Sequence, residues 1–179
     1  MANLYRVVVG RLVEVRLDCS IRTVQDVNEW FAGFAAAAAR RPAGSLAVVA
    51  ADWRSCPLLS VDAAEAARQR LAGTNPHVER SAALASPDSA VTVLQFLRLC
   101  RDSGHENRRM FKEPQTMISW LGQVLSRPER LRLAEFIAEV PVQQTPTMVV
   151  IYKGKKQPWA MWNSYPLLKS YLDTLLAGK

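Results

Sequence analysis

The chain has few of the residues that build disulfide frameworks and metal sites: three cysteines and two histidines among 179 residues. Cys19, Cys56 and Cys100 lie far apart, and neither His77 nor His105 has a second histidine or a cysteine at metal-ligand spacing. We therefore expect reduced thiols, as in a cytoplasmic protein, and neither a metal nor another cofactor. The two histidines are interpreted as solvated turn residues.

Long apolar runs are also lacking. The longest nearly unbroken run, residues 31–39, is much shorter than the roughly 20 residues that cross a bilayer. The N-terminus becomes charged at Arg6 and shows neither the apolar region nor the cleavage site of a secretory signal. These features predict a cytoplasmic protein that neither spans nor binds a membrane.

The common catalytic motifs are missing as well. The eight glycines are scattered, and none forms a phosphate-binding G-x-x-x-x-G-K-[ST] or G-x-G-x-x-G motif, or a G-x-S-x-G nucleophile turn. Asp52 and Asp62 could form a pair of carboxylates at the carboxyl edge of a sheet, although Asp62 is equally well explained by helix capping. The sequence therefore predicts a protein that is not an enzyme.

What the chain does have is the composition of a folded domain, with 49% hydrophobic and 22% charged residues. Its net charge is +7, and residues 141–179 carry five lysines against Asp173 alone. Most of the positive charge is thus concentrated near the C-terminus, where it favours solubility or an acidic partner.

Hydrophobic periodicity alternates between strand and helix along the first 139 residues. Strands are predicted over residues 5–9, 12–17, 46–51, 77–85 and 108–112, and helices begin near Ile21, Ser60, Ser86, Pro114 and Ser126. This order predicts an α/β fold with a mixed, mostly parallel sheet covered by helices.

Charged residues on two of these strands bear on which faces are buried. The first two strands form a predicted hairpin that is half buried, because Val13 and Val15 alternate with Glu14 and Arg16. In the last strand, Arg108, Arg109 and Lys112 could contact phosphate, but outward-pointing arginines that protect a sheet edge are the favoured interpretation.

The chain is divided by sequence into a domain over residues 1–139, an uncharged Pro-rich linker over 140–146 and an extension over 147–179. In the extension, a strand over 147–152, a K-G-K-K turn, a strand over 157–162 and a helix from Pro166 predict a ββα unit. So small a unit must dock on something else to bury its apolar side chains.

The segments VVAADWRSCPLLSVDAAEA (48–66) and NRRMFKEPQTMISWL (107–121), with the order of elements, resemble the STAS superfamily and its SpoIIAA-like anti-sigma-factor antagonists. The resemblance covers residues 4–125. It implies a STAS-like scaffold and a regulatory role in a bacterial cytoplasm, through binding to a protein partner.

In that family, the loop entering the second helix carries an Asp-Ser-Ser/Thr-Gly motif whose serine is phosphorylated by a partner kinase. The matching positions here are Ser60, Val61, Asp62 and Ala63. The phosphoacceptor position is therefore occupied by Val61, which has no hydroxyl, so the family's switch is not expected. Ser60 and Asp62 are the equivalents of the phosphoacceptor loop.

The extension has a weaker similarity to the C-terminal ββα part of thioredoxins, carried by Thr145, Pro146 and Thr147 before an apolar strand and K-G-K. A dithiol exchange needs two neighbouring thiols, and Cys56 has no cysteine three residues away. Cys56 lies in a predicted loop beside Arg54, which would stabilise a thiolate.

Three functions remain open at this point. The favoured one is a non-catalytic protein–protein interaction module, regulatory or scaffolding, that binds a protein partner or a second copy of itself. Aromatic and thioether side chains of the extension are its predicted contact residues, because such groups are enriched in interface cores: Trp159, Met161, Trp162, Tyr165 and Tyr171. The alternatives are a small-ligand or lipid-binding domain, with its cleft near residues 52–60, and a degenerate thioredoxin-like redox protein. Nucleic acid is not the expected partner.

Overall fold

The computed structural model describes residues 3–18, 21–86, 90–139, 150–152 and 155–157. The chain divides into two units, Met1–Glu139 and Val140–Lys179. The predicted linker, residues 140–146, belongs to the second unit and lies outside the described residues. The site described below is built entirely from the first unit.

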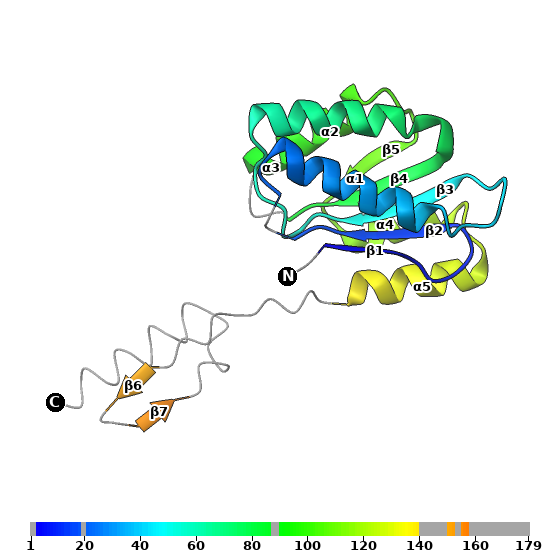
Figure 1. The fold of residues 1–179 in the computed structure, drawn as a ribbon. Helices are drawn as coiled ribbons and strands as arrows, with labels where there is room; N and C mark the ends of the chain where they lie inside the picture. Colours follow the sequence, from blue (N-terminus) through cyan, green and yellow to red (C-terminus); the bar gives the residue numbers. More distant parts are fainter. Residues whose placement is uncertain (1–2, 19–20, 87–89, 140–149, 153–154, 158–179) are drawn as a thin grey trace. The chain divides into compact units, whose positions relative to one another are not determined.

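The first unit contains one five-stranded sheet whose strands lie in chain order (Figure 1). These strands are β1 (Leu4–Val7), β2 (Leu12–Arg16), β3 (Ala47–Asp52), β4 (Val78–Leu84) and β5 (Arg108–Phe111). β1 is antiparallel to β2, and each remaining neighbouring pair is parallel. The predicted α/β fold with a mixed, mostly parallel sheet is therefore confirmed.

Helices cover both faces of this sheet (Figure 1). One face is covered by α1 (Val24–Ala38), α2 (Val61–Gly73) and α3 (Ala90–Asp102), and the other by α4 (Pro114–Gly122) and α5 (Arg127–Ala138). The first three lie on one face because each connects two adjacent parallel strands, and such crossovers share one hand. A short 3-10 turn, Asn75–His77, precedes β4. Within the described part of the chain, no helix is both long and apolar enough to span a membrane.

Alternation along the strands divides the buried side chains between two cores. On β3, Val49 and Ala51 belong to the core beneath α1–α3, whereas Val48 and Ala50 belong to the core beneath α4 and α5. Every residue of β3 is buried, as expected for a central strand covered on both faces.

The helices begin where polar side chains can satisfy free backbone N–H groups. Ser60 caps α2, and Ser126 with Glu129 forms a capping box at the start of α5, so both helices begin where the sequence predicts. A second capping box, Thr23 with Asp26, starts α1. Residues 87–89 lie outside the described residues, and α3 is described from Ala90.

In the second unit, β6 (Val150–Tyr152) pairs antiparallel with β7 (Lys155–Gln157). The returning strand therefore begins two residues before the predicted start at Gln157, and the predicted four-residue K-G-K-K turn is wrong in length. Only two residues separate the strands, the commonest length for a hairpin connection. The helix predicted from Pro166 lies outside the described residues.

Candidate functional site

The segment between β3 and α2, residues 53–60, ends at Ser60, the first of the four positions that the family resemblance identifies. Its start is fixed by Asp52, which is 1% exposed. Arg54 donates to Asp52 through its backbone N–H at 3.2 Å, its Nε at 2.9 Å and its Nη2 at 2.8 Å, and Arg16 Nε donates at 3.0 Å. Asp52 therefore holds the chain in a tight reversal as it leaves the sheet.

The ionisation of Asp52 follows from these partners. Burial alone would raise the pKa of this carboxyl, but the hydrogen bonds and charge of Arg54, with the hydrogen bond from Arg16, bring it below its ordinary value of 3.8. Asp52 is thus a fixed negative charge at neutral pH. Its oxygen atoms accept hydrogen bonds that hold the fold, so this carboxylate is poorly suited to act as a general base.

The inner side chains of this segment anchor it to the core beneath α1–α3. Trp53, Cys56 and Leu59 are buried there. The Trp53 ring meets Trp30 edge to face, with centroids 5.5 Å apart, and Phe96 with centroids 4.9 Å apart. These contacts hold the segment against the core, although it is a loop.

Neighbouring helices hold the end of the segment from two sides. Gln95 of α3 accepts from the backbone N–H of Leu59 at 2.8 Å and donates to the Leu59 carbonyl at 2.8 Å. The Ser60 hydroxyl donates to the carbonyl of Arg22, which precedes α1, at 3.2 Å. The start of α2 is thus fixed between α1 and α3.

Ser60 and Asp62 are both exposed, but Ser60 is occupied by capping. Its oxygen accepts from the backbone N–H of Ala63 at 3.3 Å, while its proton is donated to Arg22. Val61, at the position where the similar family has its phosphoacceptor, is 85% exposed. The structure therefore presents an apolar side chain where a hydroxyl would stand in that family.

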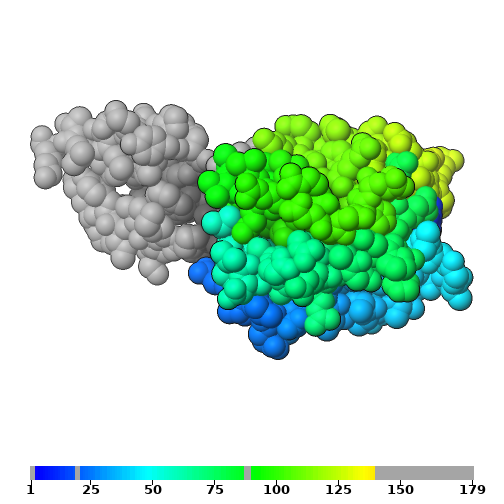
Figure 2. Space-filling view, turned by 90° about the horizontal axis from the view of Figure 1, so that it is seen from above, coloured from blue at the N-terminus to red at the C-terminus, as the bar shows by residue number. Residues whose placement is uncertain are grey.

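Val61 belongs to a group of exposed apolar side chains around this segment, which we call the apical patch. All its members lie in the first turn or two of a helix or just before one, and they are between 41 and 85% exposed: Val24, Leu58, Val61, Val91 and Leu94. Figure 2 views the layer that carries them, with α1, α2 and α3 side by side. Because exposed apolar side chains gathered in one region mark interaction sites, the apical patch is the leading candidate for a functional surface.

The pair of carboxylates considered at the strand ends is not formed. Asp52 follows Ala51 on β3 and so points to the opposite side of the sheet, where it meets Arg16 and the end of α5. Asp62 is exposed in the first turn of α2, on the face covered by α1–α3. Strand alternation separates the two groups, so this hypothesis is wrong.

The two described cysteines do not form a reactive site. Cys56 is buried, and the Arg54 expected to stabilise its thiolate is instead held by Asp52. Cys100 is also buried, and desolvation raises the pKa of its thiol to about 11. Both side chains are placed as core residues, and Cys19 lies outside the described residues.

His105 is structural, contrary to its interpretation as a solvated turn residue. One ring nitrogen, Nε2, lies 2.9 Å from the Val78 carbonyl, and Nδ1 accepts from the Asn107 N–H at 3.1 Å. His77 is exposed in the 3-10 turn. Nowhere in residues 3–18, 21–86 and 90–139 do three metal-ligating side chains come together.

The two arginines of β5, Arg108 and Arg109, differ in how deeply they are buried. β5 is an edge strand as expected, and exposed Arg109 lies over the Trp120 ring, 5.0 Å from its centroid. Arg108 is not outward, because it is only 7% exposed and belongs to the face covered by α1–α3. Its hydrogen bonds go to two hydroxyls, Ser103 Oγ at 2.6 Å and Thr74 Oγ1 at 3.0 Å.

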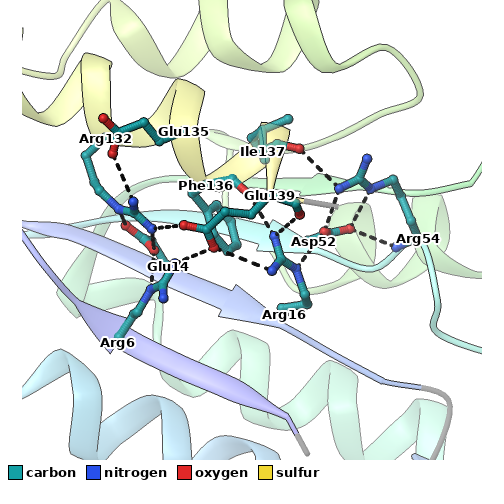
Figure 3. A network of polar contacts seen from close by, with 10 residues as sticks. All are labelled: Arg6, Glu14, Arg16, Asp52, Arg54, Arg132, Glu135, Phe136, Ile137 and Glu139. Atoms are coloured by element: carbon teal, nitrogen blue, oxygen red, sulfur yellow. Dashed lines mark hydrogen bonds and ion pairs between the residues drawn. The ribbon is translucent and has the colours of Figure 1, made fainter. Parts of the chain in front are cut away.

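A network of ion pairs joins the other face of the sheet to α5 (Figure 3). Glu14 is fully buried and accepts from Arg6 Nε at 2.6 Å and from Arg132 Nε at 2.6 Å. Arg16 donates to two carbonyls at the C-terminal end of α5, that of Phe136 at 2.7 Å and that of the C-cap residue Glu139 at 2.9 Å. The prediction of a half-buried hairpin is therefore wrong for β2, because α5 covers its charged face and supplies the opposite charges, whereas β1 is only partly buried.

The contact residues predicted in the extension, Trp159, Met161, Trp162, Tyr165 and Tyr171, lie outside the described residues. Comparison of the chain with known protein families, with curated proteins and with solved structures finds no match in any of the three.

Proposed function

We propose that the chain is a non-catalytic protein–protein interaction module of the cytoplasm, regulatory or scaffolding, that binds a protein partner through the apical patch. The observation that carries this proposal is the set of five exposed apolar side chains around the start of α2. Interface cores are rich in apolar groups, and the segment that carries these side chains is held in place by Gln95, Arg22 and the core.

The placement of the reactive groups supports a binding role. Asp52 is neutralised by two arginines, Cys100 is a buried core thiol, and His105 bonds the backbone with both nitrogens. Each of these groups is committed to holding the fold. None of these three groups belongs to the apical patch, which consists of apolar side chains.

The resemblance to the STAS superfamily agrees with this placement. In that family the start of the second helix is where a partner kinase acts, and here the same position presents Val61. We infer that partner binding is constitutive: it depends on the burial of apolar surface and is not regulated by phosphorylation at this position. A partner with a complementary apolar face, such as one side of an amphipathic helix, is the expected occupant.

The test compares substitutions of exposed apolar residues inside and outside the apical patch. Val61→Ser combined with Leu94→Ser removes apolar surface from the patch, and Leu131→Ser removes a leucine that is 62% exposed on α5. Each protein is purified from its native cells, and its co-purifying proteins and melting temperature are measured. We expect one partner to be lost from the patch variant alone, at unchanged melting temperature.

A second arm removes residues 140–179 from the wild-type chain and from the patch variant. If the same partner is retained by all variants, the apical patch is not the binding surface. If light scattering shows that the patch variant alone loses self-association, the partner is a second copy of the chain. If the deletion alone abolishes binding, the extension is the binding element and the proposal fails.

A further inference from the structure

A groove of about 600 Å³ lies between the C-terminal halves of α1 and α2, at the opposite end of these helices from the apical patch. Its α1 side is apolar, with Phe31, Phe34, Ala35 and Ala38. Polar and basic side chains also line it: Arg41, Gln69, Arg70, Thr74 and His77. The volume is in the range of roughly 300–1,000 Å³ that is typical of small-ligand sites.

A smaller cavity of about 30 Å³ lies next to this groove in the core beneath α1–α3. Phe31, Phe34 and Thr74 line both spaces. By volume, the cavity has room for about two water-sized groups. The two spaces therefore share part of their walls, and we call the cavity the inner compartment.

The inner compartment contains a buried cation that lacks an anionic partner. Arg108 lines it, and among the described residues no carboxylate pairs with this guanidinium. Its partners are two neutral hydroxyls, on Thr74 and Ser103, and its Nε has no partner in the described part of the chain. Burial lowers the pKa of Arg108 to about 10, so it remains charged at neutral pH. A buried charge without a counter-charge is costly unless something else compensates it.

A second unsatisfied donor lines the same cavity. The indole Nε1 of Trp53 is buried and makes no hydrogen bond within residues 3–18, 21–86 and 90–139. Two orphan N–H groups around one cavity are unusual, because buried polar groups are nearly always paired. The cavity and the groove offer donors, and no aspartate or glutamate of the described part of the chain lines either of them.

We propose that the groove and cavity together bind a singly charged amphipathic carboxylate, such as a medium-chain carboxylic acid. The carboxylate enters the inner compartment beside Thr74 and accepts from Arg108. The apolar chain lies in the groove against Phe31, Phe34 and Ala35. This site is separate from the apical patch and goes beyond the interaction proposed there.

Electrostatics at the groove favours an anion on balance. The carboxyl ends of α1 and α2 carry partial negative charge, which opposes one. Arg41 offsets this at α1, because its Nη1 donates to the Ala38 carbonyl at 2.9 Å. Arg70 adds a second cation at the groove wall, and the head group itself is placed at Arg108, away from the helix ends.

The first measurement is calorimetric titration of the full-length protein with decanoate, decanol and decyltrimethylammonium. We expect decanoate to bind, and to bind at least about tenfold more tightly than either other compound, since one charge-assisted hydrogen bond to a buried group is worth about 1.5 kcal/mol or more. Equal binding of decanoate and decanol would overturn the role of Arg108. Titration with decyl phosphate tests the head group, and the small inner compartment predicts weaker binding.

The second measurement uses a matched pair on α1. Ala35→Trp fills the groove from an exposed position, whereas Ala36→Trp adds the same ring at an exposed position that does not line it. Decanoate affinity should fall about tenfold or more in the first variant and stay unchanged in the second. Equal affinity in the two would show that decanoate binds elsewhere and would overturn the site.

Arg108→Met tests the buried cation directly and should abolish the preference for decanoate over decanol. If this variant does not fold, the comparison of decanoate with decanol and the pair at residues 35 and 36 still decide the proposal. Absence of binding heat for decanoate with the wild-type protein, together with an unchanged melting temperature, would refute it.

Discussion

At position 33, a close contact with another element requires glycine, although helix propensity would favour alanine. Gly33 lies in the middle of α1, where alanine is normally more favourable by about 1 kcal/mol. A Cβ at this position would lie 2.6 Å from Cδ2 and Cε2 of the Tyr5 ring. The absence of a side chain therefore allows β1 and α1 to approach each other closely.

We predict that Gly33→Ala destabilises the protein by about 1–3 kcal/mol, because overpacking displaces the Tyr5 ring or the helix. Gly73→Ala is the matched control, since no atom lies within 4 Å of a Cβ built at this last residue of α2. The control should be neutral or stabilising by up to about 1 kcal/mol. Urea unfolding of both variants measures the difference, and equal stabilities would contradict the steric argument.

At the scale of elements, α5 is attached to the sheet by charge as much as by apolar packing. No basic residue lies in its last turn, yet Arg16 and Arg54 reach its last carbonyls from β2 and from the segment after β3. Cations at a helix C-terminus are stabilising. Asp52 holds both arginines in place, so one buried carboxylate positions the helix end and the segment leading to the apical patch.

This arrangement predicts a specific loss of stability in acid. The pKa of Asp52 is lower in the folded protein than its ordinary value of 3.8, so its contribution is fully present above that pH. The contribution is lost as the pH falls from about 4 through the folded pKa. In Asp52→Asn the free energy of unfolding should be lower at pH 7, by on the order of 2 kcal/mol.

The difference between Asp52→Asn and wild type should then shrink as the pH falls below 4. Urea unfolding at pH 7, 5, 4 and 3 measures both quantities. Asp62→Asn is the control, because Asp62 is exposed and takes no part in the α5 network. A constant difference between Asp52→Asn and wild type from pH 7 to 3 would contradict the assigned ionisation.

Local patterns were sufficient to predict most elements, and insufficient to predict what covers them. The alternation of Val13 and Val15 with Glu14 and Arg16 identifies a strand, but not the α5 helix that buries its charged face. Ser60 is a recognisable cap because its effect is local. The exposure of Val61 was not predictable, since it depends on how α1 and α3 are placed by the whole fold. Arg108 escaped prediction for the same reason, because its burial depends on segments distant in the sequence.

On the scale of the whole molecule, all the described residues of both cores belong to the first unit. Three large side chains of α5, Leu133, Phe136 and Ile137, complete the core beneath α4 and α5. Glu139, the last residue of the unit, pairs with Arg6 and Arg132. The chain can therefore end after Glu139 without removing a described contact of either core.

We predict that residues 1–139 fold alone, with a melting temperature within a few degrees of the full chain, because their apolar faces cover one another.

A shorter fragment, residues 1–125, which lacks α5, should not fold. Without α5 it loses three buried side chains worth about 2–5 kcal/mol each, and this sum is comparable to the roughly 5–15 kcal/mol stability of a typical domain. It would also leave Glu14 without Arg132. Calorimetry and circular dichroism of the two fragments test this. A cooperative transition in the shorter fragment would show that α5 is dispensable, and its absence in the longer one would mean that residues 140–179 are part of the folding unit.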